Sequence, residues 1–559
     1  MQSVHPTPSS DIYDVVTLPS TNPTSSGHGT SSLEAFAPLI SNLQTEAISS
    51  LAIRVRSQMN DQPSPPPSCV VMGPPICGSF NLIYCLEFSD NIKWILRIPI
   101  NGTRSAFTNA ALALRSAILT SKYIKKHTTI PVPDIYEFKT NIDDSEIGAP
   151  YTLMSFAEGM PLWRRWYDTS LEPTLLQERR IQILEGVAKA MSQLQGLEFP
   201  KIGALKFDDP TSLIVTDITE YQTPDERADL SSLEGDDEMP HFCQMGPFST
   251  TQDFFGALMA RKHPDWQGDN FSNGMSELLR MMIGCLPLST PAMKGTLTET
   301  FVLTHPDYNY QNFLVADDGA LTCVLDWDCI STVPRCIGYS RYPGWITRDW
   351  HPMYDYDRAT PMENSPEELE EFRREWDRIM GGLLGKDYVP KTHLFEAISL
   401  AVEQPMMWSC VMDKMCKKCF QRPLFEVDLG SEVDAEWATP EGGSGSLQEA
   451  RGSDGGLGSP NRGGIFDHAS ELGRHSETDY EIDIRSDGGV SGPIPRNTDS
   501  EGDPFGGDEQ GSTVWSEDSP EDSDYRSWFR GTAVALGSGT LEPEKVAILR
   551  ETIEGFFRL

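Results

Sequence analysis

The sequence contains no uninterrupted apolar run that approaches the roughly 20 residues needed to cross a bilayer. It also has little cysteine: 11 residues among 559, an odd number scattered along the chain, which is typical of free thiols in a reducing compartment. The first 30 residues are rich in Ser, Thr and Pro and lack the basic and then apolar pattern of a secretory signal. These absences predict a chain without a membrane span, and we expect it in the cytoplasm.

Positive charge is scarce, with 45 basic residues against 82 acidic ones and a net charge of −37. Such an excess repels phosphate backbones and anionic lipids, so nucleic acid and membrane are not expected as partners. Residues 431–530 contain no lysine, and 23 acidic residues stand there against 7 arginines, with many Gly and Ser between them. Because such a segment cannot bury enough apolar surface to offset its ordering entropy, we expect a long acidic disordered insert at 426–540.

The rest of the chain shows two periodicities, one after the other. In the first part, apolar residues alternate or run together as they do in strands, and turn residues separate the runs. From about residue 175 they recur at helical spacing. The segments expected as strands are 69–72, 80–88, 93–98, 151–156, 313–315 and 322–325. A strand-rich region followed by a helix-rich one predicts an α+β fold, with an antiparallel-sheet lobe and a mainly helical lobe.

Helical patterns bracket these strands on both sides. The expected helices are 32–58, 108–126, 176–194, 276–284, 366–382, 393–420 and 543–557. The last of them presents one apolar face, so we expect it to dock on the helical lobe. The predicted organisation is a disordered leader at 1–30, a first lobe at 31–159, a second lobe at 160–425, the acidic insert at 426–540 and a final helix at 541–559.

The motif with the clearest chemistry has the form H-x-D-x4-N, followed by a short strand, a turn, a second strand and D-W-D. Phosphoryl transfer requires a carboxylate to accept the proton of a hydroxyl, and oxygen ligands to hold magnesium against phosphates. Asp307 suits the first role, and Asn312 and Asp326 suit the second. His305 suits bracing the loop better than proton transfer. Asp328 fits two roles equally well, a second metal ligand or a solvated, capping carboxylate.

Residues 305–328 resemble the catalytic segment of the aminoglycoside phosphotransferase family, within the protein-kinase-like superfamily. The resemblance implies a two-lobed protein-kinase-like fold with ATP and magnesium as cofactors. It implies that Asp307, in the same loop as His305, is the catalytic base, and that Asn312 and Asp326 bind the metal.

The resemblance continues in order along residues 65–425 and over the last helix. It implies a glycine-containing nucleotide loop, a cation on the third strand that contacts the phosphates, and a hinge whose backbone binds adenine. The residues at these positions are Gly78, Ser79 and Phe80 in the loop, Arg97 on the strand, and Met154 and Phe156 in the hinge.

Two departures from the family pattern affect the cation. The superfamily has a lysine on the third strand that pairs with a glutamate on the following helix. Here the lysine position is Arg97, which keeps the charge but changes the geometry. The glutamate position falls on Ala117, and no Asp or Glu occurs anywhere in residues 91–133. Arg97 must therefore be oriented by a different partner, or by the nucleotide alone.

The resemblance implies an ATP-dependent phosphotransferase that acts on a hydroxyl of a small molecule, which the sequence does not identify. The missing glutamate supports a second hypothesis, a pseudokinase that binds nucleotide or serves as a scaffold. In that hypothesis the acidic insert would contact protein partners.

Other motifs have a simpler interpretation. Residues 73–78 superficially resemble a phosphate-binding P-loop, but Ser79-Phe80 stands where that motif requires Lys-Ser or Lys-Thr. Cys416 and Cys419 lie on a helical pattern without a second pair, as ordinary helix cysteines do. A further group fits either a substrate pocket or loop packing: Arg341, Trp345, Arg348 and Asp349.

Overall fold

The computed structural model describes most of the two predicted lobes and the C-terminal helices. The described residues are 36–59, 67–78, 81–99, 107–209, 212–221, 242–262, 269–290, 298–351, 354, 356, 362–385, 388, 391–427 and 520–558. The predicted leader at 1–30 and most of the predicted insert lie outside them. In the described part of the chain, no helix is both long and apolar enough to traverse a bilayer.

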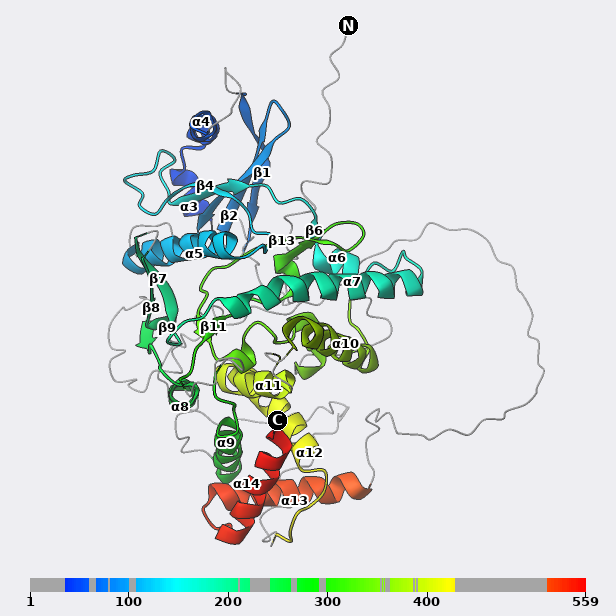
Figure 1. The fold of residues 1–559 in the computed structure, drawn as a ribbon. Helices are drawn as coiled ribbons and strands as arrows, with labels where there is room; N and C mark the ends of the chain where they lie inside the picture. The colour runs from blue at the N-terminus through cyan, green and yellow to red at the C-terminus, as the bar shows by residue number, and fades with distance from the viewer. Residues whose placement is uncertain are drawn as a thin grey trace, which may run out of the picture.

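The first lobe is built on a five-stranded antiparallel sheet in the order β1-β2-β3-β5-β4 (Figure 1). The strands are β1 Cys69–Cys77, β2 Asn81–Phe88, β3 Lys93–Pro99, β4 Ile135–Lys139 and β5 Tyr151–Ser155. The predicted alternation along β2 is confirmed: Leu82, Tyr84, Leu86 and Phe88 are all buried, because alternate side chains of a strand face the same way.

Helices lie against this sheet on two sides (Figure 1). The helices α3 (Ala37–Asn42) and α4 (Thr45–Ser57) bury Leu39, Ile48 and Leu51 in one core with the strands. On the other side, α5 (Phe107–His127) lies between the sheet and the second lobe. Its residues Leu119 and Ile124 join the core of the second lobe.

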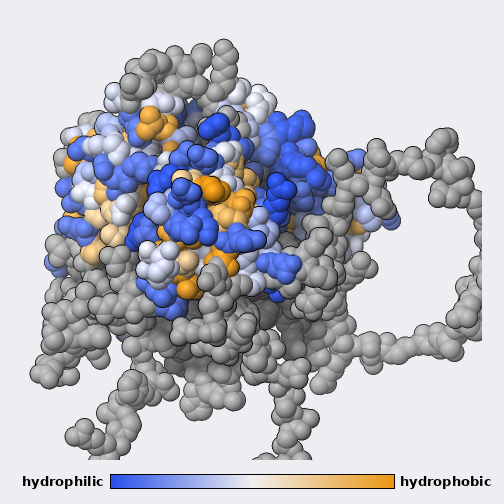
Figure 2. Space-filling view, turned by 90° about the horizontal axis from the view of Figure 1, so that it is seen from below, coloured by the Kyte–Doolittle hydropathy of each residue, from blue (hydrophilic) through white to orange (hydrophobic). Residues whose placement is uncertain are grey.

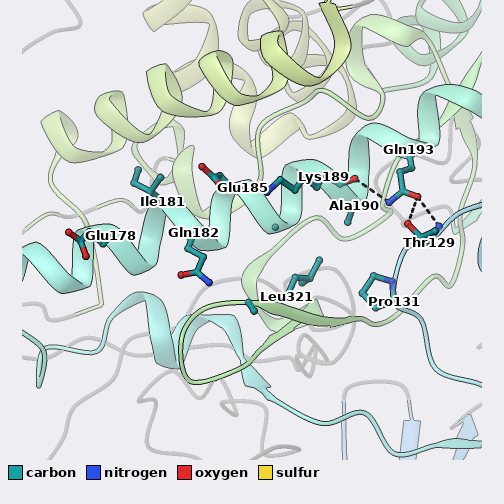
Figure 3. Close-up of a pocket in the computed structure, with 12 residues that line it drawn as sticks. Thr129, Pro131, Glu178, Ile181, Gln182, Glu185, Lys189, Ala190, Gln193 and Leu321 are labelled. Carbon is teal, nitrogen blue, oxygen red and sulfur yellow. Dashed lines mark hydrogen bonds and ion pairs between the residues drawn. The ribbon is translucent and has the colours of Figure 1, made fainter.

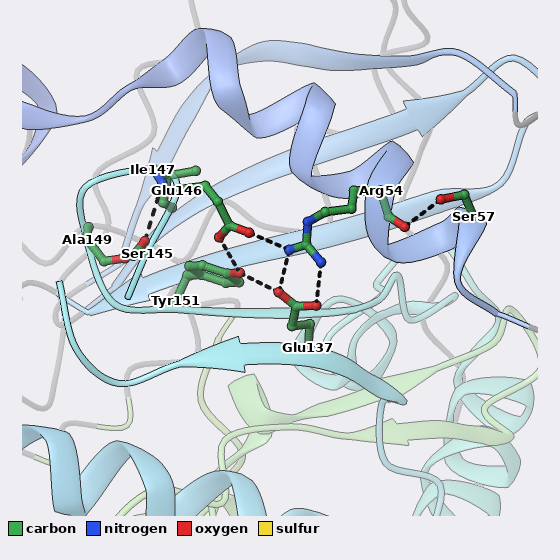
Figure 4. A network of polar contacts seen from close by, with 8 residues as sticks. All are labelled: Arg54, Ser57, Glu137, Ser145, Glu146, Ile147, Ala149 and Tyr151. Atoms are coloured by element: carbon green, nitrogen blue, oxygen red, sulfur yellow. Dashed lines mark hydrogen bonds and ion pairs between the residues drawn. The ribbon is translucent and has the colours of Figure 1, made fainter. Parts of the chain in front are cut away.

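A polar network fastens α4 to the sheet (Figure 4). The Arg54 guanidinium donates to Glu137 Oε1 at 2.6 Å and to Glu146 Oε1 at 2.6 Å. The Tyr151 hydroxyl donates to the same two carboxylates, at 2.8 and 3.2 Å. The network joins α4 to β4, β5 and the loop between those strands.

The second lobe is mainly helical, as predicted. Its helices are α6 Leu162–Trp166, α7 Pro173–Met191, α8 Thr251–Lys262, α9 Asn270–Ile283, α10 Pro366–Leu384, α11 Thr392–Glu403, α12 Pro405–Cys419, α13 Pro520–Gly537 and α14 Pro543–Phe557. Its short strands are β6 Met160–Pro161, β7 Ala204–Asp209, β8 Ser212–Thr216, β9 Ile218–Tyr221, β10 Phe242–Met245, β11 Val302–Leu303, β12 Phe313–Val315, β13 Leu321–Val324 and β14 Thr332–Val333.

Four features of the lobes differ from the sequence expectations. The helix predicted at 32–58 is divided into α3 and α4, and the one predicted at 393–420 is divided at Pro405, which opens α12. The antiparallel pairs β7–β8 and β9–β10 lie between the helices expected at 176–194 and 276–284, where no strand was predicted. The predicted insert extends too far, because its residues 520–537 form α13.

The helix α13 packs very closely on α9, at the end of the molecule away from the sheet (Figure 1). Gly274 in α9 faces the backbone of Ala533, and a Cβ at this glycine would overlap the Ala533 carbonyl oxygen. Gly537 in α13 faces Asn270 in the same way. These two glycines allow the helices to cross at close range and so position α13 on the second lobe. Seen from this end of the molecule, apolar residues lie among polar ones on the described part of the surface (Figure 2).

We expect Gly274→Ala to lower stability by about 2 kcal/mol, because the added methyl group forces the two helix backbones apart. Gly256→Ala on α8 is the matched control. No atom lies within 4 Å of a Cβ at that position, so the same change there should stabilise by roughly 0.5–1 kcal/mol through helix propensity. Thermal unfolding of both variants measures the difference, and equal melting temperatures would contradict the close contact.

Candidate active site

The predicted catalytic segment folds as a loop followed by the hairpin β12–β13. In the hairpin Phe313 pairs with Val324, and the predicted turn is closed by the Ala316 amide, which donates to the Ala320 carbonyl at 2.8 Å. The Leu325 amide continues the ladder by donating to the Asn312 carbonyl at 2.8 Å. The residue before Asp326 is thus bonded directly to Asn312, which brings the two parts of the motif together.

His305 braces this arrangement from inside. It is fully buried, and its Nε2 lies 2.7 Å from the Leu325 carbonyl oxygen. Since a carbonyl only accepts, Nε2 carries the proton. Burial lowers the pKa of the imidazole to about 4, so the ring is neutral near pH 7. These features favour the bracing role over proton transfer, since the Nδ1 atom has no partner among the described residues.

Asp307 is exposed, and one oxygen of its carboxylate accepts hydrogen bonds from two neighbouring side chains. Its Oδ2 accepts from Gln311 Nε2 at 2.8 Å and from Asn312 Nδ2 at 2.8 Å. The same Nδ2 donates to the Asp307 carbonyl at 2.9 Å. These bonds orient the Asp307 carboxylate and leave the side-chain oxygen of Asn312 as the atom that can bind a cation.

Arg97 reaches from β3 across to the two carboxylates of the D-W-D motif. Its Nη2 lies 2.8 Å from Asp326 Oδ1 and 2.8 Å from Asp328 Oδ2, and its Nη1 donates to Asp328 Oδ1 at 3.3 Å. Burial raises the pKa of Asp328, and the nearby guanidinium opposes that change. The structure thus adds a role for Asp328 that neither sequence interpretation included, as the partner of Arg97.

The backbone at Asp326 has φ of 56°, in the left-handed region that few residues other than glycine adopt. Cys329 has a similar φ of 57°. Trp327, between the two carboxylates, is buried against the His305 ring, with centroids 4.7 Å apart. This local geometry turns both carboxylates towards the same guanidinium.

The donor atoms at this site fit a magnesium ion. Asp326 and Asn312 offer oxygen atoms, which magnesium prefers, and magnesium commonly takes its remaining ligands from phosphates and water. Within the described ranges, no group of three or more His, Cys, Asp or Glu side chains gathers to hold a metal. A cation here would therefore depend on this mixed pair of protein ligands together with the oxygens of a nucleotide.

The predicted nucleotide loop and hinge are described in part. The Gly78 amide donates to the Asn81 carbonyl at 2.9 Å and closes the β1–β2 connection, whereas Ser79 and Phe80 lie outside the described residues. Met154 pairs with Ile95 within the sheet. The Phe156 amide donates to the Lys93 carbonyl at 3.2 Å, so only its carbonyl remains for an adenine.

Gly159, just after the hinge, has φ of 120° and faces the β12–β13 hairpin. A Cβ at this glycine would overlap the Thr322 hydroxyl and lie 3.0 Å from the Val315 carbonyl oxygen. Only glycine combines that backbone conformation with so close an approach. The hinge is therefore fitted directly against the hairpin of the catalytic segment.

The contacts of residues 341–349 favour loop packing, one of the two interpretations that the sequence left open. Arg341 donates to the His305 carbonyl at 2.8 Å, and Trp345 is fully buried. Arg348 forms an ion pair with Glu363, and Asp349 one with Arg373.

A buried carboxylate that the sequence did not predict lies beneath this segment. Glu396 in α11 is 7% exposed and accepts from the Tyr342 amide at 2.9 Å. Burial raises its pKa to about 7, although the charge of Arg341 opposes the shift. The only sequence signal was an acidic residue within an otherwise apolar stretch of helix.

We expect Glu396→Gln to change how stability depends on pH. Between pH 4.5 and 7 the folded wild type keeps a proton that the unfolded chain releases, so wild-type stability falls as pH rises through this window. Glutamine does not titrate and still accepts from Tyr342. The variant should therefore gain stability relative to wild type across that window, up to about 3 kcal/mol above pH 7.

Urea unfolding at pH 5 and pH 8 measures this effect. Glu371→Gln, which neutralises an exposed carboxylate on α10, is the control and should show no such gain. A Glu396→Gln variant that is equally displaced from wild type at both pH values would contradict the buried neutral carboxyl.

A separate cavity of about 600 Å³ lies along α7, next to the β12–β13 turn and the link after α5 (Figure 3). Gln193 Oε1 accepts there from the amide and the hydroxyl of Thr129, at 2.7 and 2.9 Å. Glu178, Glu185 and Lys189 add charges to its wall. None of the predicted site residues lines this cavity.

Both Arg97 and the loop at 305–312 lie in a segment that resembles known proteins. Residues 81–337 match the model of the phosphotransferase enzyme family. The matched segment, which is a little under half of the chain, is similar to that family. It spans β2 to the end of the loop that follows β14, and so contains Arg97, His305, Asp307 and Asp326.

Curated relatives match a shorter stretch of this chain. "Altered inheritance of mitochondria protein 9, mitochondrial" of Komagataella phaffii is 23% identical over 130 residues, which cover 23% of this chain and 21% of the relative. A subtelomeric hrmA-associated cluster protein of Aspergillus fumigatus is 29% identical over 128 residues, 23% of each chain. The chain spans less than a quarter of the length of these relatives.

Solved structures of kinases and phosphotransferases also resemble this chain. A macrolide 2′-phosphotransferase of Brachybacterium faecium has a TM-score of 0.34 and 13% identity, and covers 67% of this chain and 95% of its own. Amicoumacin kinase, solved with AMP-PNP and Ca²⁺, has a TM-score of 0.32 and 12% identity, with 68% and 96% covered. An ethanolamine kinase of Plasmodium vivax has a TM-score of 0.28 and 12% identity, with 71% and 97% covered.

Proposed function

We propose that this chain is an ATP-dependent phosphotransferase that transfers the γ-phosphate to a hydroxyl of a small molecule. The match of residues 81–337 to the phosphotransferase enzyme family supports the reaction class. The observation that carries the proposal is the bonding of Asp307 to Asn312, and of Asn312 to the residue before Asp326. This bonding joins a candidate base and two candidate metal ligands in one rigid unit.

In the proposed mechanism, Asp307 accepts the proton of the acceptor hydroxyl as that oxygen attacks the γ-phosphate. Gln311 and Asn312 hold one carboxylate oxygen and leave the other to face the substrate. Asn312 and Asp326 would hold magnesium, which would neutralise charge on the phosphates. Arg97 would supply a further positive charge on the nucleotide side.

We propose a small alcohol as the acceptor, because residues 305–328 resemble the catalytic segment of a family that acts on such substrates. The excess of acidic residues suits a cationic acceptor, although a solvated acidic surface explains it equally. A cytoplasmic location stays a prediction, since the name of one relative places that protein in mitochondria.

Asp307→Asn should reduce phosphate transfer by about 10²–10⁴-fold, because the amide cannot accept the hydroxyl proton. The measurement is transfer of radiolabelled γ-phosphate from ATP to a metabolite mixture. Asp318→Asn, an exposed residue in the turn of the same hairpin, is the matched control and should keep the wild-type rate. Equal rates for wild type and Asp307→Asn would remove the enzymatic proposal.

One observation favours a second function, a pseudokinase with a scaffold role. Arg97 already neutralises the candidate metal ligand Asp326, and the position of the helix glutamate is the buried Ala117. The neighbouring Ser116 donates to the Leu205 carbonyl, so this part of α5 is bound to the second lobe. A chain fixed in this state would present surfaces to partners without turnover.

Ligand-induced thermal shifts distinguish the two functions. If the site works as proposed, ATP with magnesium should raise the melting temperature of the wild type, because a ligand that binds only the folded state stabilises it. Asp326→Asn should lose most of that shift, and asparagine tolerates the left-handed backbone at this position. A wild type without any shift would favour the scaffold.

A further inference from the structure

We propose that Arg97 is an exchangeable counter-ion, which occupies the candidate metal ligand Asp326 until the phosphates of a nucleotide replace that carboxylate as its partner. In this proposal the protein alone binds divalent metal weakly, and metal and nucleotide enter the site together. The proposal rests on the function proposed above, because it assigns an order of events to the same site.

The contacts of Arg97 favour this exchange. Its Nη2 atom is 2.8 Å from Asp326 Oδ1, so the guanidinium occupies the carboxylate that a metal would use. Both Nη atoms also contact Asp328, at 2.8 and 3.3 Å. Asp328 can therefore keep the guanidinium at the site after Asp326 has been given up.

The first lobe offers Arg97 no competing carboxylate nearby in sequence. Residues 91–133, which include β3 and α5, contain no Asp or Glu. The ion pairs that the structure shows for Arg97 join residues more than 200 positions apart. The cation is thus held by the lobe that would bind the metal, and its release from Asp326 depends on a new anionic partner.

Electrostatics make the guanidinium and a divalent cation competitors. The Arg97 side chain is 20% exposed, so its charge is only partly screened by water and salt. A metal at Asp326 would have to approach this positive charge. The phosphates of a nucleotide supply an alternative partner, since guanidinium binds phosphate in a bidentate manner. Binding of one ligand should then strengthen the other by the same factor.

The test is manganese binding to the full-length protein without nucleotide, followed by electron paramagnetic resonance of the free ion. Arg97→Met removes the competing charge and should tighten manganese binding by about tenfold or more relative to wild type. Arg97→Lys keeps the charge and should remain close to wild type. Arg378→Met, which removes an exposed arginine paired with Glu375 on α10, lowers the net charge equally and should change nothing.

Equal manganese affinity of wild type and Arg97→Met would overturn the exchange. An equal gain in Arg378→Met would also overturn it, because net charge alone would then explain the result. Circular dichroism establishes that each variant is folded, and Arg97→Gln replaces Arg97→Met if the latter does not fold.

A second measurement needs no variant. Magnesium alone should leave the melting temperature of the wild type unchanged, whereas magnesium with a non-hydrolysable ATP analogue should raise it. A full shift with magnesium alone would contradict the exchange. These measurements do not follow turnover. The exchange can therefore fail while Asp307-dependent phosphate transfer is still observed, and the exchange can be observed in a protein that transfers no phosphate.

Discussion

The backbone of Leu325 is the point on which the site depends. Its amide donates to the Asn312 carbonyl, and its carbonyl accepts from the buried His305 imidazole. These two bonds connect His305 and Asn312, at the two ends of the H-x-D-x4-N motif, to the residue before Asp326. Backbone N–H and C=O groups that are withdrawn from water need hydrogen-bond partners, so the loss of either bond would cost stability. The relative placement of the base and the metal ligands follows from that constraint.

The missing helix glutamate has a structural consequence beyond Arg97. The helix α5 contains no acidic residue that could orient the cation. Its apolar residues Leu119 and Ile124 join the core of the second lobe. Ala117 is buried in the same helix. The Arg97 charge is balanced by Asp326 and Asp328 of the second lobe. The contact between the lobes therefore includes an ion pair as well as the apolar packing of α5.

Local patterns predicted the elements whose stability is local. The alternation along β2, the turn of the β12–β13 hairpin and the bounds of α14 each follow from neighbouring residues, and all are confirmed. The two-lobed protein-kinase-like fold is confirmed as well. By contrast, α13 is stabilised by contact with α9, more than 230 residues earlier, and its acidic first residues, 520–524, continue the composition of the segment before it. Its buried residues Tyr525, Trp528, Phe529 and Ala533 recur at helical spacing, but a local pattern cannot identify a partner so distant in sequence. The same reason hid the contact of Arg97 with Asp328.

The spacing of the D-W-D motif explains why a single arginine can meet both carboxylates. In an extended strand, residues two apart face the same side, but the strand ends at Val324 and the backbone turns left-handed at Asp326. Trp327 then points inwards onto His305, and the residues on either side of it point out towards Arg97. The buried tryptophan thus couples the brace of the catalytic loop to the position of the cation. A disturbance at either end should be felt at the other, since packed aromatic rings transmit small displacements.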